Sequence, residues 1–473
     1  MNAPVVLAFL CYFGVLLGIG FFAHKRSQTE SDFVLGDRSV NFWLTALSAH
    51  ASDMSAWLFM SFPAAMYIGG VSSAWIGLGL VIGMFLNWQF IAEKLRTGTE
   101  ASNSFTLSTF FEKRFGDDSG ILRLLTAIMT LVFLTIYLAA GLIAMGFLFE
   151  SLFGINYLLG ICIATTAVIA YTLFGGFVTV ATVDFFQGIF LLFVIAIVPM
   201  IALYSIGGVD DVYAALVRNG RSVSLLPDES WLSFITALLL SFGWGLGYVG
   251  QPHIITKFMG IDQSSELRKS KYLGMSWQIL ALGAATAIGL IGVAFFEGDL
   301  QNPELVFVDM VKALFHPFIG GLVLCALMAA NISTMDSQIL VCASVITEDI
   351  YKVLFRKKHT SSHLLKITRL SVGLVSVLSL LIAVSKNATV METVFFSWSG
   401  LGCTFGPLVV TSLYCKHIDK YGAYAGILFG GLTAFTWPLF NGMLTDLAIP
   451  SLVVGFPLGL AAILVVGAFG RSR

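Results

Sequence analysis

SAHASDMSAW, residues 48–57, places a carboxylate inside sequence that is otherwise apolar. The stretch holds Asp53, His50 and three serines but no bulky aliphatic residue. A charge at the centre of a bilayer costs roughly 2.5 kcal/mol or more, so such a residue faces a cavity or a partner. Small and polar neighbours let a helix unwind or let another backbone approach closely. The stretch predicts a membrane helix that is broken at Asp53, with freed carbonyl oxygens. The alternative is an aspartate satisfied by helix packing.

The composition around this stretch is that of a membrane protein. The 473 residues are 57% hydrophobic and only 11% charged, and apolar runs of about 20 residues recur along the chain. We therefore expect an all-α polytopic membrane protein, a single transmembrane domain over residues 1–473, with about 13 transmembrane helices. The predicted spans are 3–23, 42–68, 71–93, 122–150, 155–175, 180–206, 231–256, 273–297, 318–348, 365–385, 390–414, 421–440 and 447–469.

The basic residues predict the orientation of these spans. Of the 26 lysines and arginines, 22 fall in one set of alternate loops, and the other set holds only Arg218, Arg221, Lys312 and Lys386. Loops rich in lysine and arginine stay in the cytoplasm, so we expect the N-terminus outside and the C-terminus in the cytoplasm. The loop over 94–121 is expected to be partly helical, with Thr109 and Glu112 forming a capping box.

A second polar cluster, ANISTMDSQ (residues 330–338), also lies inside a long apolar span. The adjacent hydroxyls of Ser333 and Thr334 suit a hard cation such as sodium, because hard cations prefer oxygen ligands. Alternatively, each hydroxyl bonds back to its own helix. Neither this cluster nor the Asp53 break completes a cation cage by itself, so we expect the two to meet.

A third cluster, GWGLGYVGQPHII (residues 243–255), combines glycines, aromatic residues and a proline. Trp244, Tyr248 and Pro252 recur every four residues, which predicts one shared helical face. Proline removes a helical hydrogen bond, and the glycines soften the backbone. A broken helix with aromatic side chains on one face favours binding of a small solute with an apolar ring. The alternative is a helix-packing seam with interfacial aromatics.

Two weaker candidates for the transport pathway are Tyr137, in an apolar span, and Asp184, which opens a span near the cytoplasmic face. There Asp184 could also sit in water unaided. The sequence has no Gly-Lys pair and so no P-loop, which excludes an ATP-driven pump of that class. It has no HExxH motif, no paired catalytic residues and no basic tract for nucleic acid. We therefore expect no enzyme, no ATP and no nucleic-acid partner.

These clusters resemble the sodium:solute symporter family, and within it most closely the sodium/proline symporters. The matching motifs, in order along the chain, are SAHASDMSAW, TIYLAAG, GWGLGYVGQPHII and STMDSQILVCASVITEDIYK. The resemblance implies a LeuT-type fold with two inverted five-helix repeats. The implied divisions are 1–41 as an extra N-terminal helix and loop, 42–206 as the first repeat, 231–414 as the second repeat and 421–473 as two C-terminal helices.

The resemblance also implies roles for individual residues. The sodium ligands would be the backbone oxygens of Ala51, Met54 and Ala330 and the hydroxyls of Ser333 and Thr334. Asp53 would support and couple that site, and Asp184 would act near the inner sodium route. The solute would be bound by Ser55, Trp57, Tyr137, Trp244, Tyr248 and Pro252. Two positions depart from the family pattern: His50, where a small residue is usual, and Ala56, where glycine is usual. We expect His50 to point away from the site.

Together these observations predict a multi-pass protein of the cytoplasmic membrane that imports L-proline by alternating access, with sodium as the co-transported ion. One alternative is a sodium symporter of another small solute, such as sialic acid, a sugar or pantothenate. A further alternative is a membrane sensor that reuses the fold. Sensors usually carry an attached soluble signalling domain, whereas this sequence ends at FGRSR, so we expect a transporter.

Overall fold

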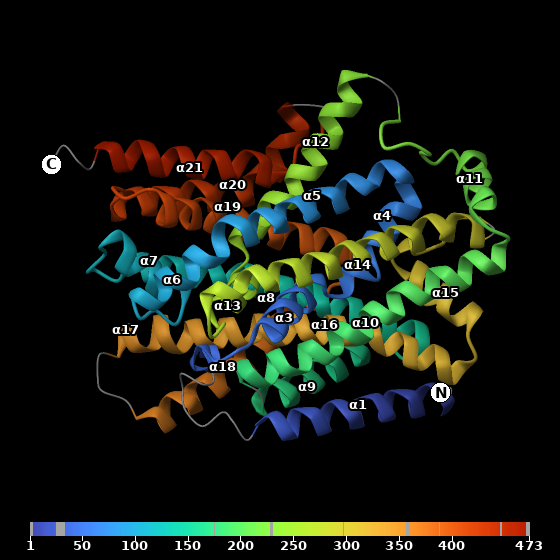
Figure 1. The fold of residues 1–473 in the computed structure, drawn as a ribbon, viewed down its shortest axis with the longest axis horizontal. Coiled ribbons are helices and arrows are strands. Elements are labelled where there is room, and N and C mark those ends of the chain that lie inside the picture. Colours follow the sequence, from blue (N-terminus) through green and yellow to red (C-terminus); the bar gives the residue numbers. More distant parts are fainter. Residues whose placement is uncertain are drawn as a thin grey trace.

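The computed structural model describes residues 3–24, 34–174, 176–227, 230–296, 298–355, 360–386, 388–444 and 447–469. In these ranges the regular secondary structure is helical apart from two isolated bridges, Val40 to Ile261 and Gly70 to Ser222. Figure 1 shows long helices that run side by side, as in a membrane bundle. Ten described helices are long and apolar enough to cross a membrane, and three shorter apolar helices accompany them. The predicted class, a polytopic helical membrane protein, is confirmed.

Every predicted span falls on helical structure. The main helices are α1 (Ala3–His24), α3 (Phe42–Met54), α4 (Ser61–Gly69), α5 (Ala74–Leu86), α8 (Ile121–Phe153), α9 (Tyr157–Phe174), α10 (Phe177–Ile206), α12 (Trp231–Gly245), α13 (Pro252–Met259), α14 (Leu267–Phe295), α16 (Pro317–Val345), α18 (Ser361–Ala383), α19 (Val390–Tyr414), α20 (Lys420–Leu444) and α21 (Ser451–Phe469). Shorter helices are α6 (Glu93–Ala101), α7 (Leu107–Phe115), α11 (Val209–Arg218), α15 (Val306–Leu314) and α17 (Lys352–Leu354). The number of spans and their orientation stay predictions. Several of the basic residues behind the predicted orientation lie outside the described residues: Lys25, Arg26, Arg356, Lys357, Lys358, Arg471 and Arg473.

Two of the predicted spans are broken near their middle. α3 ends at Met54, and a short 3-10 turn over Ala56–Leu58 leads into α4. Ser55 lies between them with φ 46°, a conformation that residues other than glycine rarely adopt. The other break separates α12 from α13 by a 3-10 turn, Leu246–Gly250. Such breaks inside membrane helices are tolerated where the freed backbone lines a protein cavity.

α16 is the central helix, and Figure 1 shows it in the middle of the bundle. Every residue from position 323 to position 340 is buried, and the helix contacts α1, α3, α8, α10 and α18. A helix buried on all sides has no lipid-facing or water-facing stripe. Its polar side chains must therefore find partners inside the protein.

The segment over 94–121 is helical, as expected, but its cap differs from the prediction. The side chain of Thr106 accepts a 3.1 Å hydrogen bond from the Thr109 amide and so caps α7. Glu112 contacts Arg123 at 3.4 Å. The predicted capping box, with Thr109 as the N-cap, is wrong. The N-cap of α7 is Thr106, three residues before Thr109.

Candidate functional site

The break after α3 contacts the polar cluster on α16, as the sequence predicts. The Ser55 amide donates a 3.0 Å hydrogen bond to Thr334 Oγ1, which donates to the Ala330 carbonyl at 3.1 Å. This directs the Ser55 amide away from the Ala51 carbonyl, its partner in a continuous helix. All of these residues are buried. Thr334 therefore bonds back to its own helix, as the alternative interpretation expects, and also joins α16 to the break after Met54.

Asp184 joins this cluster from α10. Its Oδ1 accepts a 2.6 Å hydrogen bond from Ser333, and its Oδ2 accepts from Ser48 at 2.6 Å and from Ser52 at 3.1 Å. Lys257 Nζ lies 3.1 Å from Oδ2, and both charged side chains are almost fully buried. The expectation that Asp184 could sit unaided in water is wrong.

The ion pair explains how a charge is accommodated there, because a buried charge is costly unless it is paired and hydrogen-bonded. Lys257 was assigned to a cytoplasmic loop by charge counting, but it lies within α13. Its position in PHIITKFM, a run with several large apolar residues, was the only signal that the sequence offered.

Asp53 links the two broken helices. Its Oδ2 accepts a 2.6 Å hydrogen bond from the Tyr248 hydroxyl, and that hydroxyl accepts one of 2.9 Å from Gln278 Nε2. Asn87 Nδ2 donates to the Tyr248 carbonyl at 3.3 Å. The hydrogen bond between Tyr248 and Asp53 therefore joins the break after α3 to the break after α12.

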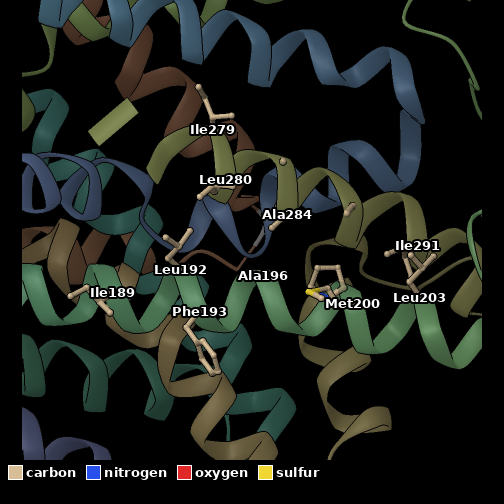
Figure 2. Close-up of a pocket in the computed structure, with 13 residues that line it drawn as sticks. Ile189, Leu192, Phe193, Ala196, Met200, Leu203, Ile279, Leu280, Ala284 and Ile291 are labelled. Atoms are coloured by element: carbon tan, nitrogen blue, oxygen red, sulfur yellow. The ribbon is translucent and has the colours of Figure 1, made fainter. Parts of the chain in front are cut away.

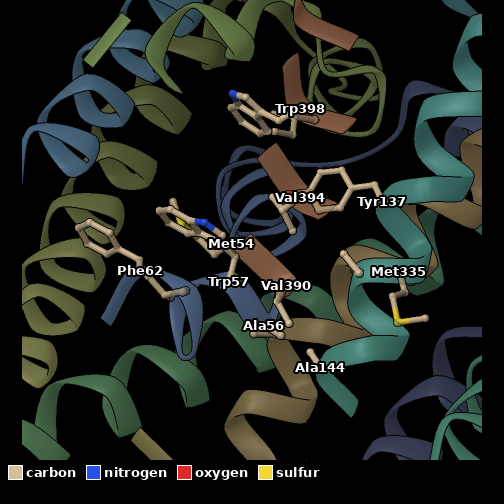
Figure 3. Close-up of a cluster of buried hydrophobic side chains, with 14 of the residues drawn as sticks. Met54, Ala56, Trp57, Phe62, Tyr137, Ala144, Met335, Val390, Val394 and Trp398 are labelled. Carbon is tan, nitrogen blue, oxygen red and sulfur yellow. The ribbon is translucent and has the colours of Figure 1, made fainter. Parts of the chain in front are cut away.

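Aromatic rings form a cluster next to this link. Trp57 stacks on Phe62 with centroids 5.1 Å apart and lies 4.9 Å from Trp244. Tyr248 meets Trp398 edge-on at 5.0 Å. Figure 3 shows Trp57, Phe62 and Trp398 around the break, with Tyr137 opposite. Trp398, on α19, is a member of the cluster that sequence reasoning missed, because nothing in its own segment distinguishes it from a core tryptophan.

A small closed cavity lies where the α3 break, α8, α16 and α19 converge. Its lining residues are Ser55, Ala56, Tyr137, Gly141, Asn331, Thr334, Met335, Gln338, Val390 and Val394. Figure 3 shows Tyr137, Met335, Val390 and Val394 converging from three helices. No water-sized sphere fits between them, so these side chains are closely packed in the structure.

The structure does not bring Pro252 to this cavity. Pro252 is the first residue of α13 and lines a second small cavity with Thr106, Thr130, Thr256 and Val341, among others. The four-residue spacing of Trp244, Tyr248 and Pro252 does not define one face, because the helix is interrupted between Gly245 and Pro252.

His50 points away from both cavities, as expected. Its Nε2 accepts a 3.2 Å hydrogen bond from Trp88 Nε1, and its ring lies between those of Trp88 and Trp277. A Cβ at Gly274 would lie 2.3 Å from His50 Nε2, so the glycine on α14 makes the room for this ring.

A buried carboxylate contacts the backbone of Val390, a residue of the cavity lining. Glu304 accepts a 2.9 Å hydrogen bond from Ser61 and accepts from the amides of Val390 and Met391 at 3.1 and 2.9 Å. It therefore ties α4 to the N-terminus of α19, where a negative charge is favourable. Glu304 lies in a polar loop sequence, so the sequence offered no sign of this contact.

A wide apolar groove lies elsewhere. Between α10 and α14 it encloses about 740 Å³ and is lined by apolar side chains such as Leu192, Phe193 and Ile279 (Figure 2). Phe193 and Ile279 are more than half exposed, which suits contact with lipid. The groove offers no polar groups to orient a solute, so it is not the candidate site.

The chain is similar to known transporters over nearly its whole length. The model of the sodium:solute symporter family matches residues 33–430. The chain is 41% identical over 458 residues to the high-affinity proline transporter PutP of Bacillus subtilis, covering 95% of both chains. It is 37% identical over 481 residues to the sodium/proline symporter of Escherichia coli, covering 100% of this chain and 94% of the relative.

Solved structures confirm the fold. A substrate-bound, outward-open Na⁺-coupled sialic acid symporter superposes with a TM-score of 0.82 at 17% identity, over 98% of this chain and 97% of the other. MhsT in complex with L-phenylalanine superposes with a TM-score of 0.59 at 16% identity, over 89% and 97%. At these identities the likeness shows the fold alone, and it confirms the expected LeuT-type architecture. With the family model covering most of its length, the chain belongs to the sodium:solute symporter family.

Proposed function

We propose that this protein is a sodium-coupled symporter that imports L-proline across the cell membrane by alternating access. The observation that carries the choice of solute is the similarity over nearly the whole chain to relatives named as proline transporters. The motifs that carry the resemblance converge in the fold, which supports the assignment. The hydrogen bond between Asp53 and Tyr248 connects the two broken helices, which supports a binding site between them.

The proposed sodium site uses the carbonyl oxygens of Ala51, Met54 and Ala330 and the hydroxyls of Ser333 and Thr334. In support, the Ser55 amide is directed to Thr334, away from Ala51. The Ser333 hydroxyl donates a hydrogen bond to Asp184, so the lone pairs of its oxygen remain available to a cation. Asp53 supports the site, and Asp184 assists sodium on the inner side.

The proposed solute site centres on the closed cavity. Ser55 and Tyr137 line it directly, and Trp57, Trp244 and Tyr248 form the aromatic cluster beside it. An aromatic face suits the pyrrolidine ring and adds a cation–π attraction of roughly 0.5–2 kcal/mol for proline's ammonium. We place Pro252 on the solute's exit route, because it lines the second cavity.

The proposed repeats, 42–206 and 231–414, each begin with a helix that is broken in its middle. α3 and α4 form the first of these, and α12 and α13 form the second. Binding sites built from discontinuous helices at corresponding positions of two repeats are typical of secondary transporters. We propose rocking of these repeats about the site as the alternating-access movement.

Purified protein in proteoliposomes tests the function directly. With one sodium ion per cycle, a 100 mV potential and a tenfold sodium gradient supply about 3.7 kcal/mol together, enough for accumulation of several hundredfold. Radiolabelled L-proline should accumulate with sodium outside, and an inside-negative potential should increase the uptake. Equal uptake with potassium in place of sodium would refute the coupling, and no proline uptake would refute the solute.

A further inference from the structure

Gln338 is a buried polar residue without a partner. Its side chain is fully buried on α16, and within the described part of the chain neither Oε1 nor Nε2 makes a hydrogen bond. The neighbouring polar side chains of this helix each make at least one hydrogen bond. Asn331 Nδ2 donates to the Gly141 carbonyl, although its Oδ1 has no partner among the described residues, Ser333 donates to Asp184, and Ser337 shares a hydrogen bond with Ser52. A buried amide with both groups unpaired is rare in native proteins and calls for an explanation.

The unpaired amide belongs to the candidate solute cavity. Residues Asn331, Thr334, Met335 and Gln338 share one face of α16, at the spacing of successive helical turns, and all four line the cavity. Tyr137 lines the same cavity from α8. The amide is therefore placed among the residues that would surround a bound solute.

We propose that Gln338 binds the solute through its side-chain amide, an inference that rests on the proposed function. Its Oε1 accepts a hydrogen bond from the ammonium of proline, and its Nε2 donates one to the carboxylate. An amino acid carries these two groups on one carbon, and a glutamine amide carries the matching acceptor and donor on one carbon. The solute supplies the partners that the protein itself does not.

The rest of the lining matches the chemistry of the remainder of the solute. Ala56, Met335, Val390 and Val394 provide apolar walls for the ring methylenes. The hydroxyls of a sugar would be left unpaired against these walls, which is costly. Thr334 lies one helical turn from Gln338, so the proposed sodium ligand and the solute amide are neighbours on α16. Binding of sodium and proline is thereby linked through adjacent residues of one helix.

The test replaces the amide without changing the volume. Gln338→Met keeps the side-chain length and removes both hydrogen-bonding groups. Gln187→Met is the matched control, because Gln187 is also buried, also has an unpaired Oε1, and contacts Tyr12 outside the cavity. L-Proline and L-prolinol binding to the full-length protein is measured by calorimetry at saturating sodium. Sodium binding is measured in the absence of solute.

Gln338→Met should weaken L-proline binding by about tenfold or more, the loss expected when hydrogen bonds to charged groups are removed. L-Prolinol lacks the carboxylate, so its binding should weaken less and the preference for proline over prolinol should shrink. Sodium binding and the Gln187→Met variant should match the wild type. Gln338→Glu keeps an acceptor for the ammonium but repels the carboxylate of proline. It should therefore weaken the binding of proline more than that of prolinol, and it provides a second test if the methionine variant does not fold.

Two results would overturn the inference alone: unchanged proline binding by the Gln338 variants, or equal weakening of proline and prolinol. The latter is what a purely structural role predicts. A wild-type protein that binds sodium but not L-proline would instead overturn the proposed function, and the inference with it.

Discussion

The Tyr248 hydroxyl donates a 2.6 Å hydrogen bond to Asp53, across 195 residues of sequence. The contact joins the break after α3 to the turn between α12 and α13, and both side chains are buried. A short hydrogen bond to a carboxylate is stronger than one between neutral groups. This contact is therefore a candidate link between the sodium site and the solute site.

Asp53→Asn keeps the size of the side chain and removes its charge. We expect sodium-driven proline uptake to fall to background while the protein still reaches the membrane, because the site loses its carboxylate. Tyr248→Phe removes only the donor and should retain part of the activity. Uptake assays with immunoblots of the membrane fraction check both variants, and near-normal uptake by Asp53→Asn would make Asp53 a packing residue.

Ser333→Ala and Thr334→Ala each remove one proposed oxygen ligand of sodium. The sodium concentration for half-maximal uptake should rise about tenfold or more in each, with the maximal rate recoverable at high sodium. Ser344→Ala is the control: Ser344 lies on the same helix, is buried, and among the described residues its hydroxyl bonds only to the Leu340 carbonyl. Uptake as a function of sodium concentration decides the matter, and an unchanged sodium dependence in both variants would defeat the assignment.

Lys257→Met breaks the buried ion pair with Asp184. Leaving one charge buried and unpaired typically costs about 3–5 kcal/mol, so thermal unfolding in detergent should shift clearly downward. The double variant Asp184→Asn with Lys257→Met removes both charges and should recover most of the stability without recovering transport. If the single variant unfolded at the wild-type temperature, the pair would contribute nothing to the fold.

Competition against labelled L-proline uptake tests the solute. Unlabelled L-proline should compete, whereas glucose, sialic acid and pantothenate should not, because the apolar walls formed by Ala56, Met335, Val390 and Val394 would leave hydroxyls of those solutes without partners. Competition by sialic acid or a sugar, with none by unlabelled L-proline, would show that the solute is another one, although sodium coupling would stand.

The sequence alone determined the membrane class, the position of both helix breaks and the polar cluster on α16. Each of these is a local property: apolar runs of span length, glycine and proline that interrupt a helix, and hydroxyls inside an apolar run. The resemblance to the family, and the fold that it implied, also came from short motifs.

The tertiary structure alone decided which polar groups meet. Asp184 pairs with Lys257 at a separation of 73 residues, and the Ser55 amide meets Thr334 at a separation of 279. Charge counting placed Lys257 in a loop, and helical periodicity grouped Pro252 with Trp244. Both methods assume an unbroken helix, whereas the chain breaks between Gly245 and Pro252. Gln338 was one polar residue among several until the structure showed both of its amide groups without a hydrogen bond in the described part of the chain. Local propensity fixes where a helix starts, stops or breaks, but partners across a bundle depend on packing between helices that are distant in sequence.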